Sequence, residues 1–228
     1  FCTVYALVTI AAVFVYLKET RPESAPTSFK LSTTFALYVR LTPNPQFALN
    51  CITNLLMYSA MFVWLSGSML VIVDGYGIRP DIGGLLFAFG SAGFMAGAAL
   101  AGRLGTRLGP HKLIISGSAI AIVAAAMIVL LGYMQIRTGL AVALPALVWM
   151  FGHGLHYPQS MAVAVAPFPE NAGAASSLIG FYQTTAGAIA AVAIGALHDG
   201  SAIPFGGLMF GLSVRNLMSL LHSLSFSF

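Results

Sequence analysis

Two histidines in an apolar part of the chain have the residue type and spacing for proton or ligand binding. His153 and His156 lie three residues apart with Tyr157 beside them, on one face of a helix expected within residues 140–165. An imidazole can gain or lose a proton near neutral pH and can hydrogen-bond a polar group of a bound molecule. The alternative is a neutral imidazole that is hydrogen-bonded inside a helix bundle, and the residues leave both roles open.

Aromatic and amide side chains in other apolar segments add candidates for the wall of a ligand cavity. Tyr58 and Phe62 lie one helical turn apart, and Tyr182 and Gln183 are adjacent in a later segment. Aromatic walls with a few polar groups accommodate varied lipophilic molecules, although aromatic side chains also face lipid or pack. Gln183 comes first among these candidates, because an amide inside a membrane needs a partner.

The acidic residues and cysteines argue against an enzyme. None of the six acidic residues lies near the middle of an apolar segment: Glu19, Glu23, Asp74, Asp81, Glu170 and Asp199. Cys2 and Cys51 have no metal-binding or redox spacing. No nucleophile, base or metal-ligand set is assembled, so we expect no enzymatic activity, no cofactor and no metal.

Composition places the chain in a lipid bilayer. Hydrophobic residues make up 58% of it and charged residues only 7%, against roughly 25% charged in soluble domains. The net charge of +4 comes from cations between apolar runs rather than on one soluble face, which excludes a nucleic-acid partner.

Seven apolar segments predict an all-α membrane protein with seven transmembrane helices. They are residues 1–17, 47–73, 82–102, 113–134, 140–165, 173–196 and 205–225. The first is short and begins without Met or a basic flank, so we interpret it as a cut helix in a fragment of a longer protein rather than a signal peptide.

Residues 18–46 form the one long polar connection and the only candidate domain boundary. They open with "KETRPESAP", and the later part has Leu31, Phe35 and Tyr38 at helical spacing, which suits either a short helix at the lipid interface or a disordered linker. Lys and Arg are concentrated in the loops after the first and third segments. The positive-inside rule then predicts the chain start outside the cell and the C-terminus in the cytoplasm.

Small residues recur where helices would touch. Gly93 and Gly97 are four apart, and residues 173–187 carry Gly173, Gly180 and Gly187 with Ser176 and Thr184 between them. Such faces let membrane helices approach closely. Arg215 and Asn216 in the last segment are the exception, because an arginine at mid-span costs roughly 2.5–3.5 kcal/mol by insertion scales.

The loop "AGRLGTRLGPHKLIISG", residues 101–117, concentrates Arg103, Arg107, His111 and Lys112 among glycines. Cations hold a loop in the cytoplasm and suit the negative end of a helix dipole, but neither role needs the order Gly-Arg-Leu-x-x-Arg-x-Gly-x-x-x-Leu found here.

That stretch resembles the loop Gly-x-x-x-Asp-Arg-x-Gly of the major facilitator superfamily. Three further stretches resemble its drug/proton antiporters of the bicyclomycin and chloramphenicol resistance (Bcr/CflA) type: "ETRP", "YGIRPDIGGLLFAFGSAGFMAGAALAGRL" and "APFPENAGAASSLIGFYQTTAGAIAA". The resemblance covers residues 1 to about 210.

The resemblance implies that the seven helices are the last helix of the N-terminal half (1–17) and the six-helix C-terminal half (47–228) of a twelve-helix transporter, joined by a cytoplasmic linker (18–46). Gly102, Arg103, Arg107 and Gly109 would form a cytoplasmic gating loop in which glycines allow close approach and arginines hold acidic partners. The acid of the full motif is absent, with Gly105 or Thr106 near its place.

The expected function is therefore multidrug efflux by proton-coupled antiport in a bacterial inner membrane. The expected partners are lipophilic drug-like molecules, protons, membrane lipids and the missing N-terminal half, which would carry the proton-coupling groups. The alternative is a seven-helix receptor or photoreceptor, which would share the topology. The last segment, however, has no Lys for a retinal Schiff base, and the basic stretch after the first segment would be unexplained.

Overall fold

The computed structural model describes residues 2–16 and 45–225, and every described element is helical. The elements are α1 (Cys2–Tyr16), α3 (Pro45–Met69), η1 (Leu70–Gly75), α4 (Pro80–Leu108), α5 (Pro110–Tyr133), α6 (Gly139–Val165), η2 (Pro169–Asn171), α7 (Ala172–Leu197) and α8 (Ile203–Ser225). Each of the seven apolar segments therefore contains a helix, which confirms the predicted all-α class. The expected interfacial helix near residues 30–40 lies outside the described residues.

Five of the helical segments are long and apolar enough to cross a membrane. They are 47–75, 80–108, 110–133, 139–165 and 169–197. At 15 residues, α1 is shorter than the roughly 20 residues that span the hydrocarbon. The 23-residue α8 is long enough but carries Arg215 and Asn216. Five of the seven predicted transmembrane helices are thus confirmed as long and apolar enough to span a membrane, and α1 and α8 are not.

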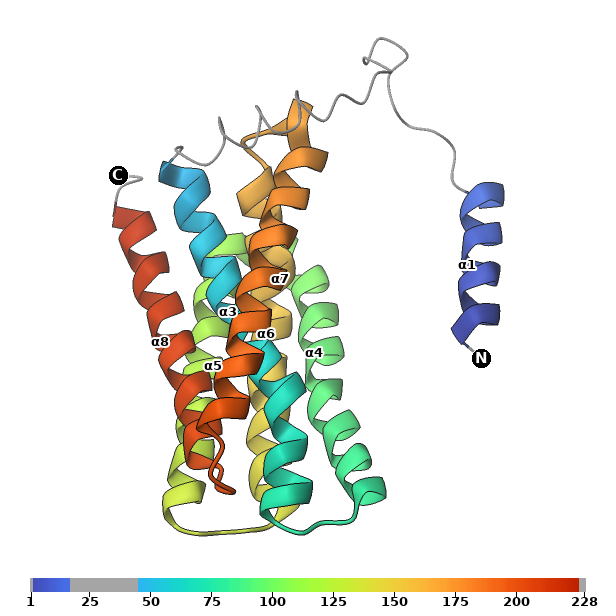
Figure 1. Ribbon diagram of the computed structural model, residues 1–228. Coiled ribbons are helices and arrows are strands. Elements are labelled where there is room, and N and C mark those ends of the chain that lie inside the picture. Colours follow the sequence, from blue (N-terminus) through green and yellow to red (C-terminus); the bar gives the residue numbers. More distant parts are fainter. Residues whose placement is uncertain (1, 17–44, 226–228) are drawn as a thin grey trace. The chain divides into compact units, whose positions relative to one another are not determined.

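The helices from α3 to α8 run alternately up and down, so that their ends meet at two levels (Figure 1). We call the level of Pro45, Leu108–Pro110 and the α6–α7 connection the Gly109 end. The opposite level, with the α3–α4, α5–α6 and α7–α8 connections, is the Gly200 end. The principal neighbours are α4 with α6, α6 with α5, α5 with α8, α8 with α3, and α3 with α7. Helix α3 also contacts α6, so α4, α6, α3 and α7 follow one another along one side of the bundle.

Glycines allow α6 to approach its two neighbours closely. A Cβ atom at Gly93 or Gly97 of α4 would collide with α6 backbone at Leu147 or Phe151, respectively, and one at Gly117 of α5 would lie 2.5 Å from the Gly152 oxygen. The predicted packing role of Gly93 and Gly97 is thus confirmed.

The predicted small-residue ridge of α7 was only partly right. Gly187 packs on Phe62 of α3, but the Cβ positions of Gly173 and Gly180 have open space around them. The hydroxyls of Ser176 and Thr184 bond back to carbonyls of their own helix, which leaves this face unpacked by the other described helices.

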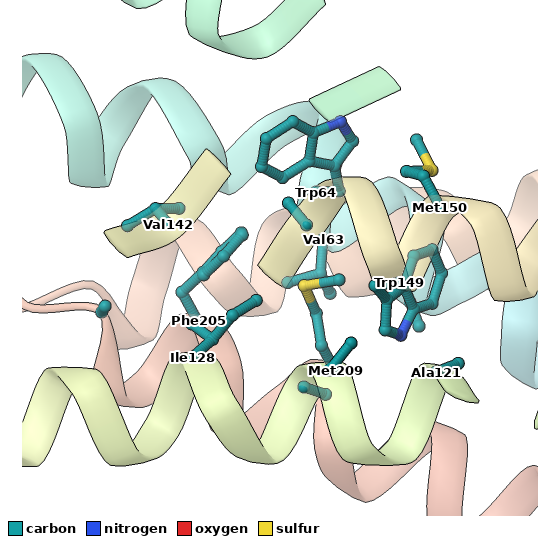
Figure 2. Close-up of a cluster of buried hydrophobic side chains, with 14 of the residues drawn as sticks. Val63, Trp64, Ala121, Ile128, Val142, Trp149, Met150, Phe205 and Met209 are labelled. Atoms are coloured by element: carbon teal, nitrogen blue, oxygen red, sulfur yellow. The ribbon is translucent and has the colours of Figure 1, made fainter. Parts of the chain in front are cut away.

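The main core lies between α3, α5, α6 and α8 and contains two tryptophans (Figure 2). Trp64 and Trp149 are completely buried, and each indole N–H donates to a serine, Trp64 to Ser91 at 3.2 Å and Trp149 to Ser213 at 3.1 Å. Large rings that are both buried and hydrogen-bonded fix the helices in register, which positions the polar residues that lie beyond them toward the Gly109 end.

Candidate functional site

His153 lies in the middle of α6 inside a group of aromatic rings. Its ring centroid is 5.3 Å from that of Trp149, 5.5 Å from Phe94 of α4 and 5.6 Å from Tyr157. Only 1% of the residue is exposed, and its Nδ1 atom has no hydrogen-bond partner among the described residues. A buried polar atom without a partner is uncommon and leaves a position for a bound group.

His156 has a different environment, because both ring nitrogens face polar side chains. Its Nδ1 lies 3.4 Å from the Ser160 hydroxyl and its Nε2 lies 3.5 Å from the Asn216 amide nitrogen. Since that amide nitrogen is a donor, Nε2 accepts and the ring hydrogen sits on Nδ1. His156 is therefore a hydrogen-bonded imidazole inside the bundle, whereas His153 Nδ1 has no hydrogen-bond partner among the described residues.

Asn216 connects His156 to two more helices. Its Nδ2 donates to the Thr53 carbonyl of α3 at 2.7 Å, and its Oδ1 accepts from Ser118 of α5 at 2.9 Å. The adjacent Arg215 is exposed on the outer side of α8. The two polar residues expected at mid-span therefore have different environments. The Asn216 amide is hydrogen-bonded inside the bundle, and Arg215 is exposed outside it.

Asn54 of α3 is the second branching point. Its Nδ2 donates to the Asn50 carbonyl at 3.1 Å, so that its Oδ1 is the acceptor for Ser160 at 3.0 Å and for the Gln183 amide nitrogen at 3.5 Å. Together these buried residues form a polar network across five helices. We use that name for Thr53, Asn54, Ser118, His156, Ser160, Gln183 and Asn216.

Aromatic rings lie next to the polar network on α3, α4 and α6. Tyr58 is 5.2 Å from Phe62 and 6.1 Å from Tyr157 between ring centroids, and Tyr157 is 6.4 Å from Phe94. These four rings are only partly buried, in contrast to His153. The aromatic wall is the name kept for Tyr58, Phe62, Phe94, His153 and Tyr157.

Of the six predicted cavity residues, five lie in or beside this arrangement. Tyr58, Phe62 and His153 belong to the aromatic wall, and His156 and Gln183 belong to the polar network. Tyr182 instead packs against a separate cluster nearer the Gly109 end that includes Phe47, Cys51 and Leu178.

Several residues of the site were missed by the sequence analysis. Asn54 and Ser160 gave one usable signal, because both are polar residues within apolar segments, whereas Phe94 gave none. Their partners could not be inferred, since Asn54 lies 106 residues from Ser160 and 129 from Gln183 in the chain.

The predicted gating residues lie at the Gly109 end, but not all in a loop. Helix α4 continues to Leu108, so Arg103 and Arg107 occupy its last turns as exposed side chains. The expectation that they follow the helix was wrong, because the helix ends only at Gly109, whose φ of 78° favours glycine. Pro110 then begins α5, as suits a residue without an N–H.

Close approach in this segment depends on a different glycine from those predicted. A Cβ at Gly102 or Gly109 would meet nothing within 4 Å, whereas one at Gly105 would lie 3.0 Å from the Gln159 amide of α6. Gln159 in turn donates to the Ala101 carbonyl at 3.3 Å. Among the described residues, neither Gly102 nor Gly109 makes a close contact with another helix.

Among the residues that the structure describes, the one ion pair joins Arg79 to Asp81 at 2.8 Å, at the Gly200 end. Neither Arg103 nor Arg107 has an acidic partner within the described ranges. No group of three or more His, Cys, Asp or Glu side chains in these ranges could hold a metal ion.

Two groups at the Gly200 end have shifted pKa values. Hydrogen bonds from Ser201 lower the pKa of Asp199, and burial raises the pKa of Tyr76 while nearby Arg137 opposes the rise. Both lie in connections between helices and outside the polar network.

Comparisons with known proteins agree with this architecture. A family model described as Major Facilitator Superfamily matches residues 1–191. The chain is 25% identical over 206 residues to a protein of Bacillus subtilis (strain 168) named "Uncharacterized MFS-type transporter YdgK", an alignment that covers 90% of this chain and 50% of that protein. The chain thus spans about half the length of the curated relative it matches. With its apolar, membrane-length helices and this match over most of its length, the chain is an integral membrane protein that belongs to the Major Facilitator Superfamily.

Proposed function

We propose that this chain is the C-terminal part of a secondary transporter that exports lipophilic, drug-like molecules in exchange for protons, as in the Bcr/CflA type. The observation that carries the proposal is the aromatic wall, backed by a polar network that extends to Gln183, in a chain of the Major Facilitator Superfamily. Partly buried rings with a few polar groups suit varied lipophilic compounds.

Alternating access would require a second half on the side of the bundle formed by α4, α6, α3 and α7. Exposed small residues on α4 and α7 support this arrangement, because they allow another membrane helix to approach. They are Ala88, Ala92, Ala96 and Ala99 on α4 and Gly173 and Thr184 on α7. In this proposal the N-terminal half of the transporter is the partner that packs on these faces.

The exposed arginines at the Gly109 end would then act between the halves. Arg103 and Arg107 have no acidic partner among the described residues, so an acidic group of the N-terminal half could pair with them in one state and release them in the other. Gly102, with open space beside it, would allow that half to approach, and Gly109 would form the turn. In this proposal the Gly109 end is cytoplasmic in a bacterial inner membrane, near anionic lipid.

The test uses the longest in-frame gene product that contains residues 1–228, expressed in cells without other exporters. Everted membrane vesicles should accumulate Hoechst 33342 when respiration is started and release it when a protonophore collapses the proton gradient. Combined Tyr58→Ala and Tyr157→Ala substitutions should reduce the initial rate at equal protein content, while Tyr133→Ala, on an exposed ring at the Gly200 end, should not. Dye accumulation that is unchanged when the protonophore is added would contradict proton coupling.

A further inference from the structure

The polar network gives Gln183 a defined orientation. Asn54 donates from its own amide nitrogen to the Asn50 carbonyl, and a carbonyl accepts only from a donor. The Asn54 Oδ1 atom is therefore the one that faces Ser160 and Gln183. An oxygen without hydrogens must meet the nitrogen of the Gln183 amide, so that Nε2 faces inward, toward α3.

The other end of the Gln183 amide is available to a ligand. Gln183 is only 3% exposed, and among the hydrogen bonds between described residues that name its atoms, its Nε2 is the donor and its Oε1 is not used. Its neighbours belong to the aromatic wall, because Gln183 also hydrogen-bonds the side chain of Tyr157, whose ring lies 6.1 Å from that of Tyr58. A fixed acceptor thus lies at the edge of a group of rings.

A second polar atom on the same wall lacks a partner. His153 Nδ1 is enclosed without a hydrogen bond among the described residues, and the centre of its ring lies 5.5 Å from that of Phe94 and 5.6 Å from that of Tyr157. No acidic side chain lies among the residues of the polar network or the aromatic wall. Such a surface suits an uncharged molecule with a planar apolar part, and the available oxygen of Gln183 requires a hydrogen-bond donor from it.

From this geometry we infer that Asn54 is a positioning residue that orients Gln183, so that the site selects uncharged aromatic compounds carrying a hydroxyl or N–H donor over equivalents that offer only an acceptor. This inference rests on the proposed function and adds the polarity of the ligand to it. Asn54 itself contacts Gln183 and Ser160 rather than the ligand.

The test measures binding of two matched probes to the chain in lipid nanodiscs by equilibrium dialysis, with uptake by empty nanodiscs subtracted. 2-Naphthol carries a donor, and 2-methoxynaphthalene has the same ring with an acceptor only. Wild-type protein should bind 2-naphthol about fivefold more tightly than 2-methoxynaphthalene, as expected for one additional neutral hydrogen bond. Asn54→Leu and Gln183→Met should each reduce that preference to about twofold or less.

Ser213→Ala is the matched control, because Ser213 is a buried serine with an interhelical hydrogen bond, to Trp149, and lies outside the polar network. It should keep the preference even if it lowers stability. Asn54→Ser, which is polar but too short to reach Gln183, replaces Asn54→Leu if that variant does not fold. A wild-type chain that binds both probes equally or neither, or a preference that survives substitution of Asn54 in a folded variant, would overturn the inference. If the protein exports the dye in vesicles but shows no preference between the two probes, the inference is wrong and the proposed function is still supported.

Discussion

At the scale of single residues, Asn216 and Arg215 show how burial decides what a polar group does in a membrane. Asn216 is enclosed and hydrogen-bonded to α3, α5 and α6, while its neighbour Arg215 faces outward. From the sequence, the two residues could only be described together as costly. A step of one residue along the helix separates a buried, hydrogen-bonded group from an exposed charge.

This contrast predicts opposite effects of two adjacent substitutions. Asn216→Leu should lower the free energy of unfolding by about 2 kcal/mol, because it removes three interhelical hydrogen bonds that each contribute roughly 0.6 kcal/mol in membrane proteins. Arg215→Leu should leave stability unchanged or raise it, since an arginine near the bilayer centre is unfavourable. Unfolding by SDS in mixed micelles measures both. An Asn216→Leu chain as stable as wild type would argue against the network.

At the scale of helices, the apolar runs predicted where each helix lies, but not where all of them end. Helix α4 extends six residues past the predicted end at residue 102, because Leu104 and Leu108 continue its partly apolar surface and only Gly109 has the positive φ that ends it. The hydropathy pattern predicted that the helix ends before Arg103 and that Arg103 and Arg107 lie in a loop. An exposed arginine in the last turn of a helix is instead favourable, since it faces the negative end of the dipole.

The spacing of the glycines predicted close helix contacts. These contacts are present where another described helix lies opposite the glycines and absent where none does. Gly93 and Gly97 face α6, whereas Gly173 and Gly180 face open space. The pattern reports the face of a helix that permits contact, and it carries no information on which helix is opposite. For the same reason the polar network could not be predicted, because its members are brought together from distant parts of the chain.

Two glycines of α4 provide a matched test of this packing. Gly97→Ala should destabilise the chain by about 1–3 kcal/mol, because the added methyl group collides with the backbone of Phe151 in α6. Gly102→Ala, with no atom within 4 Å of its Cβ position, should be neutral or stabilising by up to about 1 kcal/mol. Thermal unfolding in detergent compares the two. Equal melting temperatures for both variants would contradict the close contact of α4 and α6.

At the scale of the whole molecule, the bundle has two ends with different charge. Among the described residues, Arg103, Arg107 and Lys112 are exposed at the Gly109 end, and the Gly200 end has Arg79, which is paired with Asp81, and Arg137. The positive-inside rule therefore still assigns the Gly109 end to the cytoplasm. The bundle itself is the same in either orientation, so only a labelling experiment decides.

Cysteine labelling tests the orientation. In a background with Cys2→Ser and Cys51→Ala, a cysteine replacing Thr106 should react with an impermeant maleimide only after the inner membrane is opened. A cysteine replacing Ser201, at the Gly200 end, should react in intact spheroplasts. The reverse pattern would invert the topology and remove the cytoplasmic role proposed for Arg103 and Arg107.

We propose above that these helices form one half of a transporter and need the other half to work. The most direct measurement compares protonophore-sensitive Hoechst 33342 accumulation in everted vesicles that contain residues 1–228 alone with vesicles that contain the longest in-frame product. The account predicts no transport by residues 1–228 alone and transport by the longer product, because the ligand would be enclosed between two halves. Proton-dependent transport by residues 1–228 alone would contradict it.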